Sequence, residues 1–295
     1  MMAVQLNDYI KENQLIVNQA IIEIVERMNI PTTLKNSMLY SIKAGGKRIR
    51  PILMIASAEA FGGTRDDVLP VAVALEMIHT YSLIHDDLPA MDDDQLRRGQ
   101  PTNHIQFDEA TAILAGDALL TMAFQVITEA KQLSAEQKVT VINRLSIASG
   151  SSGMVAGQIL DLEAEEKQID LAQLEQIHQL KTGELLIFAV EMGAYLAGAS
   201  QTERLAVKQY GHHIGLLFQI QDDILDVEGD QIKLGKQVGS DQDNEKSTYP
   251  KLLGIDGAIK VKEKNVAMAI KLLEEANIAN SMLASLVNYI SDRDV

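Results

Sequence analysis

SLIHDDLPAMDDDQLRRGQ, residues 82–100, is the end of an apolar run followed by five aspartates and two arginines. The run itself, AVALEMIHTYSLI at 72–84, places its large side chains at helical spacing. Because the apolar residues stop where the charged residues begin, the stretch predicts a core helix that ends in a charged loop. The same helical pattern occurs in ATAILAGDALLTMAFQVI at 110–127 and in HHIGLLFQIQDDIL at 212–225.

The chain as a whole predicts an all-α protein. No proline lies between Pro101 and Pro250, so long helices can run through this region unbroken, and the sequence lacks alternating strand-like runs. We expect breaks between helices at 61–67, 88–101, 164–170 and 228–250. None of these segments has the composition of a linker between domains.

The composition excludes several classes of protein. Asp and Glu outnumber Lys and Arg by 41 to 26, and the resulting formal charge of −15 would repel nucleic acid and anionic membranes. The chain has no cysteine, which excludes disulfides and thiol chemistry. The N-terminal residues do not resemble a secretory signal, and the best candidate for a membrane span, 185–199, is too short and carries Glu191. We therefore expect a soluble, cytoplasmic protein.

A second acidic cluster, DDILD, also follows an apolar helical stretch. Its Asp222 and Asp226 are four residues apart on one helix face, where like charges destabilise a helix unless a cation binds. Asp86 and Asp92 of the first cluster are six apart, on different faces of an ideal helix, but Pro89 lets the chain bend so that their carboxylates converge. Such oxygen ligands suit magnesium, which commonly bridges protein carboxylates and substrate phosphates.

Basic residues accompany the first acidic cluster. Arg97 and Arg98 follow it directly, and the segment GGKRIRP contributes Lys47, Arg48 and Arg50. These side chains are charged donors for phosphate oxygens, and arginine can bind them through two hydrogen bonds at once. Together, the acidic and basic residues predict a diphosphate site with two sub-regions.

Other interpretations of the same residues fit less of the pattern. Each acidic cluster taken alone fits a solvated helix end equally well, but the pair, with each member behind an apolar helix, favours a site. An EF-hand loop starting at Asp92 would need glutamate at its twelfth position, which is Asn103. GGKR lacks the frame of a P-loop. His85 is expected to be a packed or hydrogen-bonded helix residue.

Six segments carry a resemblance to a known family. They are GGKRIRP, EMIHTYSLIHDDLPAMDDDQLRRG, KTG at 181–183, FQIQDDILD, LGK at 234–236 and KSTYP at 246–250. In this order they resemble the short-chain trans-prenyl diphosphate synthases, most closely the bacterial farnesyl diphosphate synthases, over nearly the whole chain. The resemblance implies a homodimer of single all-helical domains, residues 1–295, each with helices around a deep central cavity and both acidic motifs at its mouth.

The resemblance also implies roles for individual residues. Magnesium, three ions per site when substrate is bound, would be held by Asp86, Asp87, Asp92, Asp222, Asp223 and Asp226. The allylic substrate, dimethylallyl or geranyl diphosphate, would contact the magnesium ions and Arg97, Lys181, Lys236 and Lys246. Isopentenyl diphosphate would contact Gly46, Lys47, Arg50, His79 and Arg98. The oxygens of Thr182 and Gln219 would face the allylic cation, with Lys181 as the third catalytic residue.

The implied reaction is the formation of farnesyl diphosphate. The allylic diphosphate leaves, the double bond of isopentenyl diphosphate attacks the resulting cation in a dry apolar tunnel, and a proton is lost. In this family the fifth residue before the first acidic motif sets the product length, and the bulk of Tyr81 at that position favours fifteen carbons. A helical projection instead places Ser82 nearer the face beneath Asp86.

Several alternatives to this function stay open. A geranylgeranyl diphosphate synthase would differ in the cavity floor. A noncatalytic subunit of a heteromeric synthase generally lacks one acidic motif, whereas both are intact here. An acidic calcium-binding protein, a rival from another class, is favoured still less. Class I terpene cyclases usually replace the second acidic motif, so DDILD argues against them.

Three further features carry expectations of their own. Gly153 and Gly157, four residues apart, predict close helix packing, with Gln158 and Asp161 able to approach the mouth of the site. The segment LGKQVGSDQDNEKST, 234–248, is expected to close over bound diphosphate with its lysines. Glu184 follows KTG where many relatives of the family carry a small apolar residue, which places an extra carboxylate near the allylic site.

Overall fold

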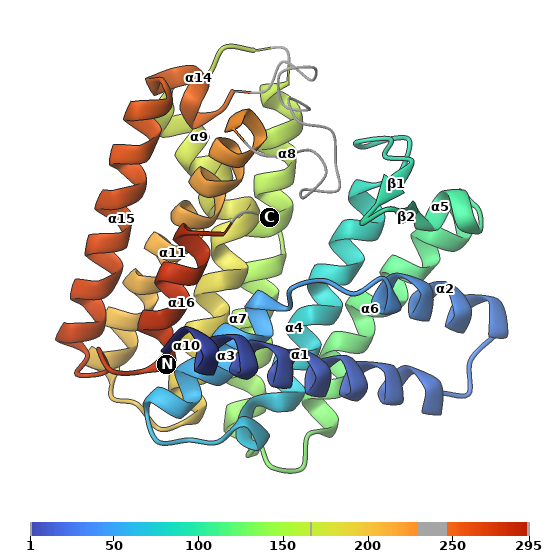
Figure 1. The fold of residues 1–295 in the computed structure, drawn as a ribbon. Coiled ribbons are helices and arrows are strands. Elements are labelled where there is room, and N and C mark those ends of the chain that lie inside the picture. The colour runs from blue at the N-terminus through green and yellow to red at the C-terminus, as the bar shows by residue number, and fades with distance from the viewer. Residues whose placement is uncertain (1, 166, 229–246, 294–295) are drawn as a thin grey trace. The chain divides into compact units, whose positions relative to one another are not determined.

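The described residues are mostly helical, with a single two-residue strand pair among them (Figure 1), which confirms the predicted all-α class. The computed structural model describes residues 2–165, 167–228 and 247–293. Contacts within the chain divide it into two compact units, residues 1–55 with 65–142 and residues 56–64 with 143–295. Two helices contain a boundary between the units, α3 (Ile49–Ala60) and α7 (Ala135–Ser149). A single domain around a central cavity stays a prediction from the sequence.

The first unit is built around two long apolar helices. Besides parts of α3 and α7, it contains α1 (Met2–Arg27), α2 (Thr32–Lys43), α4 (Arg65–Asp86), β1 (Leu96–Arg97), β2 (Gln100–Pro101), α5 (Asn103–Gln106) and α6 (Glu109–Glu129). Helices α4 and α6 pack along one another, while α1 and α2 pack together and each also contacts α4. On α4, Val71, Leu75 and Ile78 are fully buried. Burial of such side chains is the main force that holds these helices together.

Pro70 lies inside α4 without ending it. A proline has no backbone N–H, so the carbonyl of Asp66, four residues earlier, loses its partner in the helix. The side-chain amide of Gln132 donates a hydrogen bond to this carbonyl at 3.1 Å. The lost helical hydrogen bond is therefore replaced from a distant segment.

The second unit is built around α11 (Gln201–Glu228). This unit also contains α8 (Met154–Ala164), α9 (Leu171–His178), η1 (Gln179–Gly183), α10 (Glu184–Leu196), α14 (Tyr249–Leu253), α15 (Ile255–Glu275) and α16 (Met282–Ser291). Helix α11 packs mainly against α10 and α15 (Figure 1). Leu216, Ile220 and Ile224 on α11 form a buried cluster with Leu174 and Tyr249.

The predicted helix breaks agree with the structure. Helix α3 ends at Ala60, α4 ends at Asp86 and α8 ends at Ala164, each at or just before a predicted break. The fourth break begins at the end of α11, and most of it, including residues 234–246 of the segment expected to close over diphosphate, lies outside the described residues.

Two local elements were not predicted. The first is a two-stranded hairpin in which Leu96 pairs with Pro101 and Arg97 with Gln100. Its central residues, Arg98 and Gly99, both have positive φ angles, 54° and 74°, as a type I′ turn requires. The second is η1, a π-helical turn over QLKTG between α9 and α10. Such turns are rare and occur frequently at functional sites.

Length and composition alone would allow α4 and α6 to cross a membrane. In the structure, 67% of the apolar window of α4 and 44% of that of α6 is buried within the chain. The two helices pack against each other as core helices do. The segment 185–199 lies largely within α10, which has 13 residues and is mostly buried.

Candidate active site

The first acidic segment folds back on itself at the end of α4. The backbone N–H of Asp92 donates to the carbonyl of Asp86 at 2.9 Å, and that of Asp93 donates to the carbonyl of Leu88 at 3.1 Å. The bend expected at Pro89 is therefore confirmed: it brings residues that are six apart in sequence into direct contact. Asp86 is partly buried and Asp92 is exposed, so both carboxylates lie at the surface of this unit.

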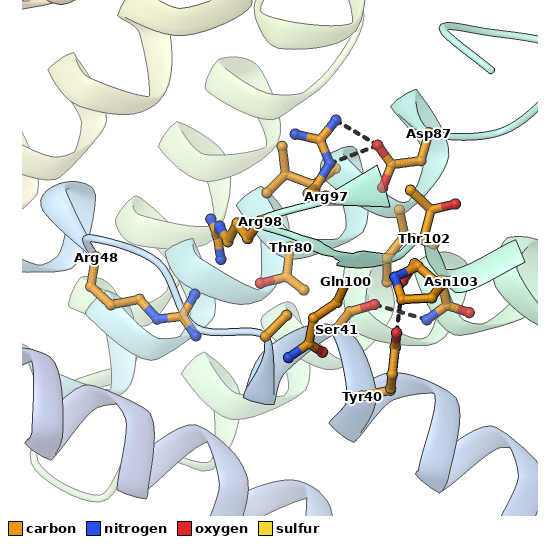
Figure 2. A pocket seen from close by; sticks show the side chains of 14 residues that line it. Tyr40, Ser41, Arg48, Thr80, Asp87, Arg97, Arg98, Gln100, Thr102 and Asn103 are labelled. Carbon is orange, nitrogen blue, oxygen red and sulfur yellow. Dashed lines mark hydrogen bonds and ion pairs between the residues drawn. The ribbon is translucent and has the colours of Figure 1, made fainter. Parts of the chain in front are cut away.

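Asp87 points into the unit instead. Its side chain is 4% exposed, and its Oδ1 accepts a hydrogen bond from Nε of Arg97 at 2.6 Å (Figure 2). Burial raises the pKa of Asp87 above its ordinary value, and the hydrogen bond and charge of Arg97 act in the opposite direction. Arg97 is thus fixed by the acidic motif that precedes it.

The β1–β2 hairpin carries Arg98 to the segment GGKRIRP. A Cβ added at Gly46 would lie only 2.5 Å from the guanidinium nitrogens of Arg98, and Gly46 has a φ of 129°, so this position requires glycine. The hairpin is anchored to α2, because the hydroxyl of Tyr40 donates to the carbonyl of Pro101 at 2.7 Å and the amide of Asn103 donates to Ser41 at 2.8 Å.

His79 of α4 lies in a positively charged region near Arg98. Burial lowers the pKa of His79 well below its ordinary value, and the charges of Arg50, Arg98, Arg48 and Arg97 add to the effect. His79 is therefore neutral near pH 7 and surrounded by guanidinium groups. The structure thus brings together predicted contacts of isopentenyl diphosphate from α3, α4 and the hairpin. Their collective charge favours an anion.

Arg48 corrects the expectation that every basic residue of GGKRIRP contacts phosphate. It is 4% exposed, and its Nη1 forms an ion pair with Glu76 at 2.6 Å. Its Nη2 donates to the carbonyl of Ile42 at 2.7 Å and its Nε donates to Asn18 at 2.7 Å. Each guanidinium nitrogen therefore bonds within the protein, and Arg48 is a structural residue.

In the second unit, the KTG motif lies on η1 and is approached closely by two other helices. A Cβ at Gly157 of α8 would lie 2.1 Å from the backbone nitrogen of Lys181, and one at Gly215 of α11 would lie 2.8 Å from Cα of Gly183. The close packing predicted from the glycine pair is confirmed at Gly157. The Thr182 hydroxyl donates to Oε1 of Gln219 at 2.8 Å, which joins the two predicted cation-facing residues.

A pocket of about 160 Å³ opens beside this motif. The polar residues that line it include Asp161, His178, Lys181, Thr182, Gln219 and Asp223. Lys181 forms an ion pair with Asp161 at 2.7 Å, so the approach of Asp161 to the site is confirmed. The pocket combines a cation, carboxylates and two linked side-chain oxygens.

The three aspartates of the second motif differ in their surroundings. Asp222 has a 40% exposed side chain and forms an ion pair with Arg293 at 2.7 Å. Asp223 is 5% exposed and its Oδ2 accepts a hydrogen bond from the backbone N–H of Tyr249 at 2.9 Å. Asp226 is 2% exposed. Asp222 is the member of the motif with the most open carboxylate.

His178, Tyr249 and Arg293 are neighbours of the site that were not predicted from the sequence. The rings of His178 and Tyr249 are 5.7 Å apart, and burial lowers the pKa of His178 to about 4. The guanidinium of Arg293 lies 3.9 Å from the ring centre of Phe218 and also forms the ion pair with Asp222. Nothing in the local pattern around Arg293 indicates this long-range contact.

Tyr81 and Ser82, the predicted chain-length residues, differ in burial. Tyr81 is 6% exposed, and burial, assisted by the charge of Asp86, raises its pKa to about 12. Its ring packs edge-on against His85 with centroids 5.7 Å apart. Ser82 is partly buried and donates to the carbonyl of His79 in its own helix at 3.0 Å. Tyr81 is therefore the bulkier and more enclosed of the two.

His85 is a packed helix residue, as expected. Its Nε2 lies 3.1 Å from the carbonyl oxygen of Ile113, and a Cβ at Gly116 would lie 2.1 Å from the same nitrogen. Gly116 thus makes room for the imidazole between α4 and α6.

The charged neighbours of Glu184, which are Arg144, Lys208 and Glu191, are not among the residues that line the pocket. Burial raises the pKa of Glu184, Arg144 and Lys208 lower it, and Glu191 raises it. Arg144 also forms an ion pair with Glu191 at 2.7 Å. These charged residues interact with one another and do not line the pocket. The influence of Glu184 on the allylic site therefore stays a prediction. Lys236 and Lys246 lie outside the described residues.

Within the described part of the chain, no three His, Asp or Glu side chains converge as a metal-binding group. Magnesium commonly keeps several waters and takes only one or two carboxylates from the protein. The exposed Asp92 and the partly exposed Asp86 and Asp222 fit that mode of binding. Their roles as ligands stay a prediction.

Comparison with known proteins identifies the family. The model of the polyprenyl synthetase family matches residues 31–290. The chain is 46% identical to the farnesyl diphosphate synthase of Bacillus subtilis, over 98% of this chain and 99% of the relative. It is 50% identical to the geranylgeranyl diphosphate synthase of Cyanophora paradoxa, over 97% of this chain and 96% of the relative. The crystal structure of a geranyltransferase from Legionella pneumophila matches with a TM-score of 0.88 and 34% identity, covering 99% of each chain. With its all-helical fold and both acidic motifs, the chain belongs to the polyprenyl synthetase family, whose members are prenyltransferases.

Proposed function

We propose that the protein is a magnesium-dependent farnesyl diphosphate synthase that condenses dimethylallyl or geranyl diphosphate with isopentenyl diphosphate. The observation that carries the proposal is the pocket of about 160 Å³ that Asp161, Lys181, Thr182, Gln219 and Asp223 share. It offers an ammonium group for a diphosphate and two linked oxygens for a carbocation. The similarity to the Bacillus subtilis enzyme over almost the whole chain supports the same activity.

The described residues divide the work of this reaction. Arg98, Arg50 and Lys47 bind the diphosphate of isopentenyl diphosphate, and the neutral His79 beside them can share hydrogen bonds without adding charge. Lys181 binds the allylic diphosphate and stabilises it as it leaves. Asp86 and Asp92 of the first acidic motif, and Asp222 of the second, would each hold magnesium, which would supply further positive charge for a leaving diphosphate. Thr182 and Gln219 present oxygens to the allylic cation.

A homodimer in the cytoplasm is part of the proposal. Helix α6 is apolar along its length, yet Ile113 is 43% exposed and Leu114 is 59% exposed. Neighbouring exposed apolar side chains commonly mark a surface that contacts another protein. A second copy of this chain is the partner that the family resemblance implies.

The proposal is tested by the product. Purified protein is incubated with magnesium, labelled isopentenyl diphosphate and either allylic primer, and the product is sized after its phosphates are removed. We expect a fifteen-carbon alcohol. A twenty-carbon alcohol would instead support a geranylgeranyl diphosphate synthase, the activity of the Cyanophora paradoxa relative. No product from either primer would favour the noncatalytic subunit.

Tyr81→Ala is expected to shift the main product from fifteen to twenty or more carbons. Truncating a buried aromatic ring opens space below the first acidic motif, so a longer chain can enter before product release. The measurement is the same sizing of labelled alcohols. Ser82→Ala is the matched control one residue along the helix and should keep the fifteen-carbon product. If Ser82→Ala lengthened the product and Tyr81→Ala did not, the floor would be assigned to Ser82.

A further inference from the structure

Two side chains of α1 contact the GGKRIRP segment on either side of Lys47. The side-chain amide of Gln14 donates to the carbonyl of Gly46 at 2.5 Å. One helical turn later, Oδ1 of Asn18 accepts from Nε of Arg48 at 2.7 Å. Residues four apart share a helix face, so one face of α1 fixes the residues before and after Lys47.

The segment between α2 and α3 needs such support because its backbone is unusual. Gly45, Gly46 and Arg48 have φ angles of 81°, 129° and 53°. Positive φ is costly for a residue other than glycine and persists where surrounding contacts enforce it. For Arg48, contacts with Glu76, Ile42 and Asn18 supply this support. At Gly46, the amide of Gln14 bonds to the carbonyl oxygen.

Gly46 is also the residue against which the guanidinium of Arg98 packs. Any movement of the Gly46 peptide would therefore shift Lys47, which follows it in the chain. It would also shift the surface against which the guanidinium of Arg98 packs. Gln14 itself lies on another helix, and none of the roles assigned above includes it.

We propose that Gln14 is a positioning residue for the isopentenyl diphosphate site, and that it holds the Gly46 peptide so that Lys47 and Arg98 meet the diphosphate together. This inference rests on the proposed function and deepens it. Gln14 acts through the backbone of Gly46, so its effect falls on one substrate. The allylic pocket around Lys181 and Gln219 belongs to a different part of the chain.

The test is the steady-state kinetics of Gln14→Ala with each substrate varied in turn. We expect the KM for isopentenyl diphosphate to rise about fivefold, the equivalent of one ordinary hydrogen bond, with kcat and the KM for geranyl diphosphate unchanged. Gln14→Lys keeps a donor of similar reach and should restore most of the affinity. Gln14→Glu replaces the donor by a negative charge and should raise the KM further.

The matched control is Gln19→Ala. Gln19 is an exposed glutamine of the same helix, and its amide donates to Glu23 of α1 at 2.9 Å, so all kinetic constants should stay unchanged. The proposal is overturned if Gln14→Ala leaves the KM for isopentenyl diphosphate unchanged, if it raises both KM values together, or if Gln19→Ala has the same effect.

A second measurement separates this inference from the proposed function. If the wild-type protein forms no product, calorimetric titration with inorganic diphosphate in the presence of a metal chelator still probes the basic site. Under these conditions a site that depends on magnesium does not compete. About fivefold weaker binding to Gln14→Ala, with Gln19→Ala unchanged, would support the positioning role although the proposed reaction had failed. Equal binding by the two variants would overturn it.

Discussion

Asp86→Ala and Asp222→Ala are each expected to lower turnover at least about a thousandfold while the helical circular dichroism stays intact. Each variant removes a carboxylate proposed to bind magnesium, and charge stabilisation in the transition state is commonly the largest single contribution to catalysis. Asp222 has a 40% exposed side chain and Asp86 is only partly buried, so neither truncation leaves a large cavity. The measurement is kcat at saturating substrates, together with the far-ultraviolet spectrum.

Two control variants isolate the cause of that loss. Asp256→Ala removes an exposed aspartate from the first turn of α15 and should leave turnover close to that of the wild type. Arg293→Met breaks the ion pair with Asp222 but keeps the carboxylate, so its loss should be much smaller than that of Asp222→Ala. Equal losses would assign the effect to the ion pair, and a fully active Asp86→Ala would contradict the metal assignment.

Features governed by local pattern could be predicted from the sequence. The period of apolar residues predicts helices such as α4 and α11, and glycine with charge marks the breaks between them. The bend that brings the backbone of Asp92 onto that of Asp86 was predictable because Pro89 interrupts the helix at a known place. Gly157 was predictable for a similar reason, since only the absence of a side chain allows α8 to approach the backbone of Lys181 so closely.

Features that depend on distant partners could not be predicted. GGKRIRP shows a cluster of basic residues, but only the position of Glu76 in the fold decides that Arg48 turns inward. The hairpin was missed because Arg98 occupies a turn position that Asn or Asp usually fills. Arg293 reaches Asp222 across about 70 residues of sequence, and a lone arginine near the end of a chain carries no signal of such a contact.

The buried pair of Arg48 and Glu76 leads to the second large effect. Arg48→Met is expected to lower the free energy of unfolding by about 3–5 kcal/mol, because it leaves an uncompensated carboxylate in the interior. Both side chains are 2% exposed, and Oε2 of Glu76 already lacks a hydrogen-bond partner in the described residues. Thermal and urea unfolding followed by circular dichroism measure the change.

Arg27→Met provides the comparison, because the same substitution there breaks an ion pair of similar length, 2.8 Å, with Glu23 on the surface of α1. Exposed pairs contribute little, so its loss should be at most about 0.5 kcal/mol. Arg48→Met/Glu76→Leu removes both buried charges and should recover much of the stability lost in the single variant, since an apolar pair can replace a buried ion pair. If Arg48→Met proved no more destabilising than Arg27→Met, Arg48 would not be a structural residue. Its guanidinium would then return to the group of phosphate donors expected from GGKRIRP.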